Sequence, residues 1–161
     1  MPAVAIRKMK RENRAEIAAI LQKTPEFTAD EVRVALELID DYLKNGRKSG
    51  YFISIAVTDS TVAGYICYGI RPLTSGSWDI YWAAVHPDLK GKGIGRLLFT
   101  AAEEHIRRSG GRIILIETSS KPGYEGTISF HHSMGYKDIC SIEDFYSIGD
   151  HLLMLIKRIQ Q

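Results

Sequence analysis

The sequence has few of the features that mark specialised classes of protein. Its 161 residues include two cysteines, Cys67 and Cys140, which lie far apart among apolar neighbours, so neither a disulfide framework nor a zinc motif is indicated. No apolar run approaches the roughly 18 residues of a membrane-spanning helix, and the N-terminus lacks the apolar core of a signal peptide. These absences favour a cytoplasmic protein with no role at a membrane, in which both cysteines are reduced thiols packed in the interior.

An excess of charge is also lacking. The 21 basic and 19 acidic residues leave a formal charge of +2, which does not favour a nucleic-acid-binding protein. The length, with 45% hydrophobic and 25% charged residues, is typical of one globular domain, expected to span residues 1–161. The charges are unevenly distributed, because residues 24–41 hold six acids and one base whereas residues 86–112 hold six bases and three acids.

The first half of the chain has the pattern of strands and amphipathic helices. Thr28 and Glu31 form a capping box ahead of a helical apolar stripe that ends at Asn45-Gly46. Two β-rich segments on either side of the polar turn at 58–60 predict an antiparallel hairpin. The expected elements are a strand at 3–9, helices at 13–23 and 28–45, and strands at 51–57, 62–70 and 77–85.

The second half indicates a βαβ unit. A helix expected at 93–108 separates the strand at 77–85 from a strand at 112–118, whose continuous apolar run, Ile113 to Ile116, suits burial on both faces. The two strands should therefore be parallel neighbours. A short helix at 127–134 and strands at 137–141 and 151–159 complete an α/β fold with a mixed sheet and helices on its faces.

The strongest chemical signal is the glycine-rich turn at residues 86–96, which reads HPDLKGKGIGR between a strand and a helix. The first N–H groups of a helix have no partner within it, and their partial positive charge makes an anion site. Glycine lets a phosphate approach closely, and Lys90, Lys92 and Arg96 add full charges. The turn predicts a ligand that carries phosphate.

Two common phosphate-binding motifs fit less well. No P-loop sequence is present. A dinucleotide fingerprint needs a third glycine where this chain has Leu98, although Glu117 could imitate its ribose-binding acid. That turn also normally opens a βαβ fold, whereas this one follows a series of antiparallel strands. A dinucleotide-dependent oxidoreductase is therefore the less favoured alternative.

The turn and its surroundings resemble the GCN5-related N-acetyltransferases. KGKGIG at 90–95 is similar to the family's acetyl-CoA motif [Q/R]-x-x-G-x-[G/A], with lysine in the first place, and WAAVHP at 82–87, LIETS at 115–119 and FHHSMGY at 130–136 supply its context. The resemblance implies a six- to seven-stranded mixed sheet with about four helices, open between the strands that end near Val85 and Thr118. It also implies direct acetyl transfer from acetyl-CoA, the co-substrate, to a primary amine of a small molecule or peptide.

The resemblance also assigns a cofactor site. The pantetheine would lie in the opening of the sheet, with Val85 holding its amide, and backbone N–H groups between Ala83 and Val85 would stabilise the tetrahedral intermediate. The residues assigned to the cofactor are Ala83, Val85, Lys90, Gly91, Lys92, Gly93, Ile94, Gly95 and Arg96.

Catalysis needs a base, because an alkylamine with a pKa near 10.4 is mostly protonated at neutral pH. The resemblance places Asp79 at the base position, where partial burial would raise its pKa, and Glu117 is the competing candidate. A tyrosine in much of the family protonates the departing thiolate, and here that position is His131. Tyr124 or solvent is the alternative source of that proton.

The acceptor is the least specified part. Residues expected to line its pocket are Phe27, Tyr68, Arg71, Tyr81 and Tyr124. Arg71 would suit an anionic group on the acceptor or lie in solvent. No metal site is predicted, because adjacent histidines point apart on a helix. A non-catalytic acyl-CoA-binding or sensing module is the second alternative, and a homodimer through the C-terminal strands is conceivable.

Overall fold

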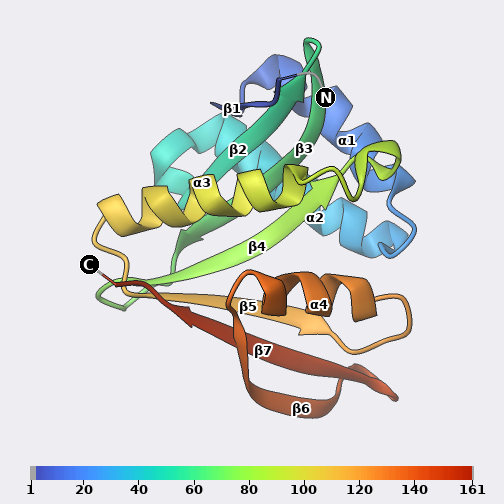
Figure 1. Ribbon diagram of the computed structural model, residues 1–161, viewed down its shortest axis with the longest axis vertical. Helices are drawn as coiled ribbons and strands as arrows, with labels where there is room; N and C mark the ends of the chain where they lie inside the picture. The colour runs from blue at the N-terminus through green and yellow to red at the C-terminus, as the bar shows by residue number, and fades with distance from the viewer. Residues whose placement is uncertain (1–2, 161) are drawn as a thin grey trace.

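The computed structural model describes residues 3–160, which form a seven-stranded mixed sheet with helices on both faces (Figure 1). The strands are β1 (Ala5–Lys8), β2 (Tyr51–Thr58), β3 (Thr61–Ile70), β4 (Ser77–Val85), β5 (Ile113–Ser119), β6 (Lys137–Ser147) and β7 (Asp150–Arg158). The helices are α1 (Arg14–Lys23), α2 (Ala29–Asn45), α3 (Ile94–Arg108) and α4 (Glu125–Ser133), with short 3₁₀ helices at Arg11–Asn13, Gly46–Ser49 and Pro87–Leu89.

The strand order is β1-β2-β3-β4-β5-β7-β6. Strands β1 to β4 are antiparallel, β4 and β5 are parallel with α3 as their crossover, and β5, β7 and β6 are again antiparallel. The predicted mixed sheet and the βαβ unit at its centre are confirmed.

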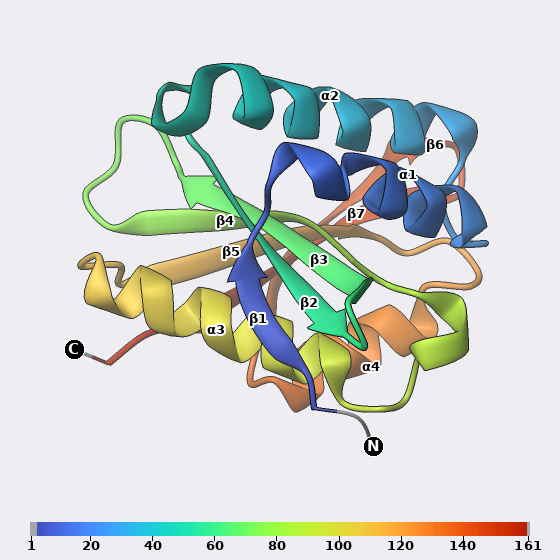
Figure 2. The same ribbon diagram turned by 90° about the horizontal axis from the view of Figure 1, so that it is seen from above.

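The helices form two layers, one on each side of the sheet (Figure 2). Apolar residues of α1 and α2, such as Ile17 and Ile39, pack with Ile55 and Tyr65 on one face of β2 and β3. On the other face, α3 packs over the centre of the sheet, and α4 lies on the same side (Figure 2). The capping box of α2 is formed, because the Glu31 N–H donates to Thr28 Oγ1 at 3.2 Å and the Thr28 N–H donates to the Glu31 carboxylate at 2.6 Å.

The sheet opens between β4 and β5. These strands pair only from Ser77, opposite Ile113, to Ile80, opposite Ile116, and then diverge (Figure 1). At the same point the register of β3 with β4 shifts, so that Tyr81 is an extra residue on β4. The last five residues of β4 therefore have no β5 neighbour, and the expected opening is confirmed.

The C-terminal strands differ most from expectation. Strand β6 runs to Ser147 rather than Ser141, and each of its 11 residues is exposed. Cys140 lies on it and is exposed, so its predicted burial is wrong, whereas Cys67 is buried as expected. The cause is position, because an edge strand has a neighbour on one side only.

None of the helices within residues 3–160 is long and apolar enough to cross a membrane.

Candidate active site

A cavity of about 550 Å³ lies where the sheet opens. Its floor includes Ala83 to Val85 at the end of β4, and α4 contributes Phe130 and His131 to a wall. Its other walls come from the glycine turn, the first turns of α3, the α1–α2 connection and the β5–α4 loop. All the residues assigned to the cofactor line this cavity except Lys92, which is exposed beside it.

The glycine turn is shaped to receive an anion. Gly91 and Gly93 have φ of +77° and +80°, and a Cβ built on either would meet nothing within 4 Å. Helix α3 begins at Ile94 without a side-chain cap, so its first N–H groups are free to bind a ligand. Arg96 lines the cavity, and Lys90 lines it while pairing with Glu26 at 3.0 Å. These groups fit the phosphates of acetyl-CoA.

The two candidate bases are joined by one arginine. Arg71 donates to both oxygens of Asp79, with a shortest distance of 2.6 Å, and its Nη2 lies 3.4 Å from a Glu117 oxygen. These hydrogen bonds raise the pKa of Arg71. Asp79 is 7% exposed, whereas the Glu117 side chain is 43% exposed. Asp79 is thus buried as an ion pair rather than alone, and Arg71 is occupied by the protein instead of facing an anionic acceptor.

Tyr81 and Glu117 stand at the vertex of the opening. Each is the first residue after the last β4–β5 pair, Ile80 with Ile116. The Tyr81 ring packs edge-on against Tyr51 at 5.4 Å, and burial raises the pKa of its phenol to about 12. Tyr81, Asp79 and Glu117 do not line the cavity itself, but Ala83, two residues beyond Tyr81, does. The candidate bases therefore lie just past the cofactor cavity.

His131 is a buried wall residue of the cavity. It is 7% exposed and packs among the rings of Phe99, Phe130 and Tyr136. Its Nδ1 has no hydrogen-bond partner within residues 3–160, and burial lowers the pKa of the imidazole to about 4. The ring is neutral at pH 7. The expected role as a general acid required a protonated ring with a carboxylate neighbour, and the structure supplies neither.

Tyr124 and Phe27 line the cavity as expected. The Tyr124 hydroxyl donates to Glu31 at 3.3 Å, and burial raises its pKa. Lys121 pairs with the same carboxylate at 3.4 Å, and Phe27 packs edge-on against Trp82. These contacts tie the start of α2 to the β5–α4 loop, and this places an aromatic ring and a carboxylate beside the cavity.

Tyr68 is not part of the site, and its assignment to the acceptor pocket is wrong. Its side chain is 3% exposed and packs on the α3 side of the sheet, with its hydroxyl 3.0 Å from His105 Nδ1. Side chains alternate along β3, so Tyr68 faces away from its neighbour Cys67, which packs on the α1–α2 side.

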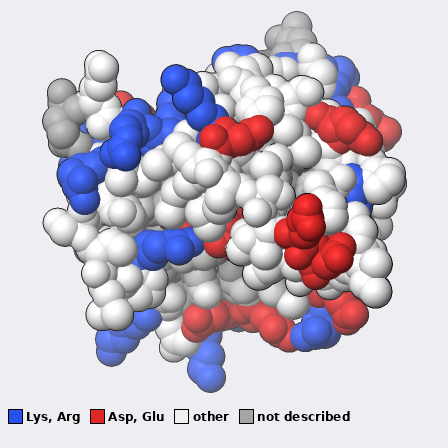
Figure 3. All heavy atoms as spheres, turned by 90° about the horizontal axis from the view of Figure 1, so that it is seen from below, with Lys and Arg blue, Asp and Glu red and all other residues white. Residues whose placement is uncertain are grey.

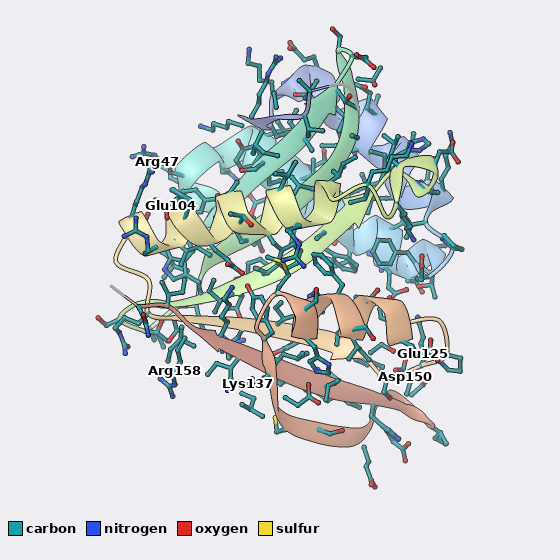
Figure 4. All side chains as sticks on the ribbon, in the orientation of Figure 1. Arg47, Glu104, Glu125, Lys137, Asp150 and Arg158 are labelled. Atoms are coloured by element: carbon teal, nitrogen blue, oxygen red, sulfur yellow. The ribbon has the colours of Figure 1, made fainter. Side chains whose placement is uncertain are left out.

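Tyr146 is a site residue that sequence reasoning missed. It lies in β6 between Ile142 and Ser147, where the register with β7 shifts. Burial raises the pKa of its phenol to about 12, and the charges of Glu117, Asp150 and Glu31 add to this shift. Asp150 lies at the same end of the molecule as Glu125, far from Arg158 (Figure 4). The only signal in the sequence was an aromatic pair, Phe145-Tyr146, beyond the expected end of the strand.

Comparison with known proteins decides the family. The model of the acetyltransferase (GNAT) family matches residues 14–136. The chain belongs to the GNAT acetyltransferases. Family membership sets aside the dinucleotide-dependent oxidoreductase. None of the curated proteins with which the sequence was compared matches it.

Solved structures agree with this GNAT assignment. A protein from Desulfovibrio desulfuricans assigned to the GNAT family is 34% identical, with a TM-score of 0.93 and coverage of 97% of this chain and 99% of its own. The ribosomal-protein-S18-alanine N-acetyltransferase of Escherichia coli has a TM-score of 0.78 at 15% identity, covering 99% and 96% of the two chains. YncA of Salmonella typhimurium, solved with its cofactor acetyl-CoA, has a TM-score of 0.75 at 20% identity, covering 99% and 95%. The latter two share the fold.

Proposed function

We propose that this GNAT protein transfers the acetyl group of acetyl-CoA directly to a primary amine of a small molecule or peptide, with both substrates bound at once. Acetyl-CoA is the co-substrate. The observation that carries the proposal is the cavity, which extends from the uncapped N-terminus of α3 to the region where β4 and β5 diverge. The end at α3 suits the phosphates of acetyl-CoA. The carboxylates of Asp79 and Glu117 lie beyond the end where β4 and β5 diverge.

Backbone groups supply the oxyanion site. The part of β4 from Tyr81 to Val85 has lost its β5 neighbour, so N–H groups on this edge are free to bind the ligand. An N–H group near Ala83 stabilises the oxygen that becomes negative as nitrogen attacks the thioester carbon. Because backbone N–H groups stabilise the oxyanion, positions 83 and 84 can be alanines, which have no polar side chain.

Glu117 is the better base of the two carboxylates. Asp79 accepts three hydrogen bonds from Arg71 and is nearly excluded from solvent, so it has little capacity to take a proton from an amine. Glu117 has one long contact with Arg71 and an exposed side chain. We therefore assign proton abstraction to Glu117, directly or through a water molecule, and a positioning role to Asp79 and Arg71.

The proton balance needs no dedicated acid. The amine nitrogen forms a bond to the thioester carbon, the carbon–sulfur bond breaks, and one proton passes from nitrogen to Glu117. The neutral imidazole of His131 and the Tyr124 phenol, whose pKa is raised, are weak acids. The carboxylic acid formed on Glu117 is a stronger one, and it returns the proton through water to the thiolate of CoA.

Two measurements test the proposal. Calorimetry should show binding of acetyl-CoA and none of NAD. Release of free thiol should then be followed with amino acids, polyamines and peptides as acceptors. Absence of thiol release with every acceptor, despite binding of acetyl-CoA, would favour the non-catalytic sensor and reject the enzyme.

A further inference from the structure

The sheet has one face that the helices leave partly uncovered. Contacts of α1 and α2 fall on β2, β3 and β4, whereas α3 and α4 lie on the other side of the sheet (Figure 2). The register pairs Glu117 with Met154, Leu115 with Ile156, and Ile142 with Leu152. Since paired residues share a face, we define the open face by Leu115, Glu117, Ile142, Met154 and Ile156.

The exposure of alternate residues supports this assignment. Ile114, Ile116 and Leu155, which point the other way, are at most 4% exposed. On the open face, Leu115, Met154 and Ile156 are partly exposed and Ile142 is 48% exposed, whereas Ser119 and Leu152, paired at one end of this face, are buried. The open face is therefore mostly apolar, with the proposed base, Glu117, within it and the basic side chains of Lys137 and Arg158 at the end away from Ser119.

The shape of the acceptor end does not suit a small molecule. Sites for small ligands are concave and enclose most of the ligand surface. The residues that line the cavity include Phe27, Tyr124 and His131 but not Glu117, Asp79 or Tyr81. An amine that meets Glu117 thus lies on an open, mostly apolar surface, where affinity requires contacts spread over a longer molecule.

The charges around this surface determine whether a positively or a negatively charged acceptor is attracted to it. The charges of Glu117, Asp150 and Glu31 all act on Tyr146; Glu31 is paired with Lys121, and Arg71, the guanidinium beside Glu117, is committed to Asp79. Acidic side chains gather toward one end of the face formed by β6 and β7, and basic ones toward the other (Figure 3). The reaction end thus attracts a positively charged chain end and repels a carboxylate.

The available bases favour an amine that loses its proton easily. Asp79 is held by Arg71, Glu117 is open to water, and burial lowers the pKa of His131 to about 4. At about pH 7.5, roughly a third of peptide α-amines, with a pKa of 7.7–8.0, are neutral, against about a thousandth of lysine side chains. An α-amine therefore depends much less than a lysine side chain on a strong base to remove its proton.

From these observations we infer that the acceptor is the N-terminal α-amine of a polypeptide, whose first residues lie extended across the open face. The inference rests on the proposed function and narrows it to one class of amine. The α-amine meets Glu117 at the vertex, and apolar side chains of the following residues contact Met154, Ile156 and Ile142.

The test compares acceptors that differ in one property at a time, with the full chain and acetyl-CoA. Thiol release is measured with an amino-acid amide, with lysine-free peptides of increasing length that begin with the same residue, and with an N-terminally blocked peptide that contains lysine. We expect kcat/KM to rise at least about tenfold with length and to be lowest for the blocked peptide. No rise with length, or a preference for the lysine peptide, would overturn the inference.

A variant pair locates the binding surface. Ile142→Ser removes an exposed apolar side chain from the open face, and Leu97→Ser removes one that is 43% exposed on α3. We expect Ile142→Ser to raise the KM of the longest peptide by about 3- to 10-fold, with no effect on the amide, and Leu97→Ser to leave both unchanged. Equal effects of the two variants would show that the peptide does not bind on the open face. Thiol release with small amines alone would refute the inference while sustaining the proposed function.

Discussion

At the scale of single residues, the arrangement of Arg71, Asp79 and Glu117 is the basis of the roles proposed for them. One guanidinium holds a buried carboxylate with three hydrogen bonds and touches an exposed one with a fourth. A buried carboxylate that is already paired is costly to disturb, whereas an exposed one can exchange protons with a substrate. The sequence placed Asp79 first because burial alone would raise its pKa, but it contained no sign that Arg71, eight residues away, would pair with it.

Glu117→Gln tests the assignment of the base. We expect kcat with an amine acceptor to fall by at least about 10²-fold, because proton abstraction is lost. The dissociation constant of acetyl-CoA, measured by calorimetry, should not change. Glu37→Gln, a substitution of an exposed carboxylate on α2, is the matched control. A Glu117→Gln enzyme with wild-type kcat would remove Glu117 from this role.

Arg71→Ala tests the positioning pair. The substitution leaves Asp79 buried without its partner, so we expect the free energy of unfolding to fall by about 1–3 kcal/mol, less than for a fully buried pair because Arg71 is partly exposed. Adding Asp79→Asn should recover part of the loss in denaturant unfolding, since the uncompensated charge is removed. Additive losses in the double variant would show that the two side chains do not interact.

His131 gives a pH-dependent contribution to stability. Burial lowers the pKa of His131 in the folded protein to about 4, below its ordinary value of 6.5, so the unfolded chain binds a proton more readily. The contribution is complete above pH 6.5 and is lost as the pH falls toward 4, by up to on the order of 3 kcal/mol. His131→Phe should flatten this part of the curve of melting temperature against pH, measured from pH 4 to 7.5.

The same variant tests the leaving-group chemistry. Because a neutral imidazole is not an effective acid, we expect the kcat of His131→Phe at pH 7.5 to stay within a few fold of wild type. A fall of about 10²-fold with unchanged binding of acetyl-CoA would restore His131 as the acid.

At the scale of elements, the start of α3 is the proposed binding site for the phosphates of acetyl-CoA. Gly93 has a positive φ, precedes the first helical residue and lines the cavity, so any side chain there is strained beside the anion site. The sequence showed this element clearly, because glycine spacing, helix periodicity and basic residues coincide within a few positions. The register of β6 was not predictable in the same way, because an irregular edge strand has neither clear alternation nor a buried face.

Gly93→Ala and Gly110→Ala form a matched pair. Both glycines have φ near +80°, and a Cβ at either meets nothing within 4 Å, but only Gly93 lines the cavity. We expect each substitution to lower the free energy of unfolding by about 1–2 kcal/mol, because the backbone of an alanine is strained at positive φ. Only Gly93→Ala should weaken acetyl-CoA binding in calorimetry. Equal dissociation constants for the two variants would argue against phosphate binding at this turn.

At the scale of the whole molecule, the fold brings together segments that the sequence keeps apart. The cavity draws on three connections between elements, α1–α2, β4–α3 and β5–α4, and the open face joins β5 to the C-terminal hairpin. Local patterns predicted the helices, the parallel pair and the phosphate site. They did not reveal that Tyr68 packs under α3, because its face follows from alternation along β3 that only the position of the helices interprets, or where Tyr146 lies, because it follows a register shift between β6 and β7.

The most direct test of the account is to locate the transferred acetyl group. The protein, acetyl-CoA and a lysine-free peptide with a free N-terminus are incubated together, and the product is sequenced by tandem mass spectrometry. The account predicts one acetyl group on the peptide α-nitrogen, formed in step with free CoA and much more slowly by Glu117→Gln. Release of CoA without acetylation of any amine would contradict it.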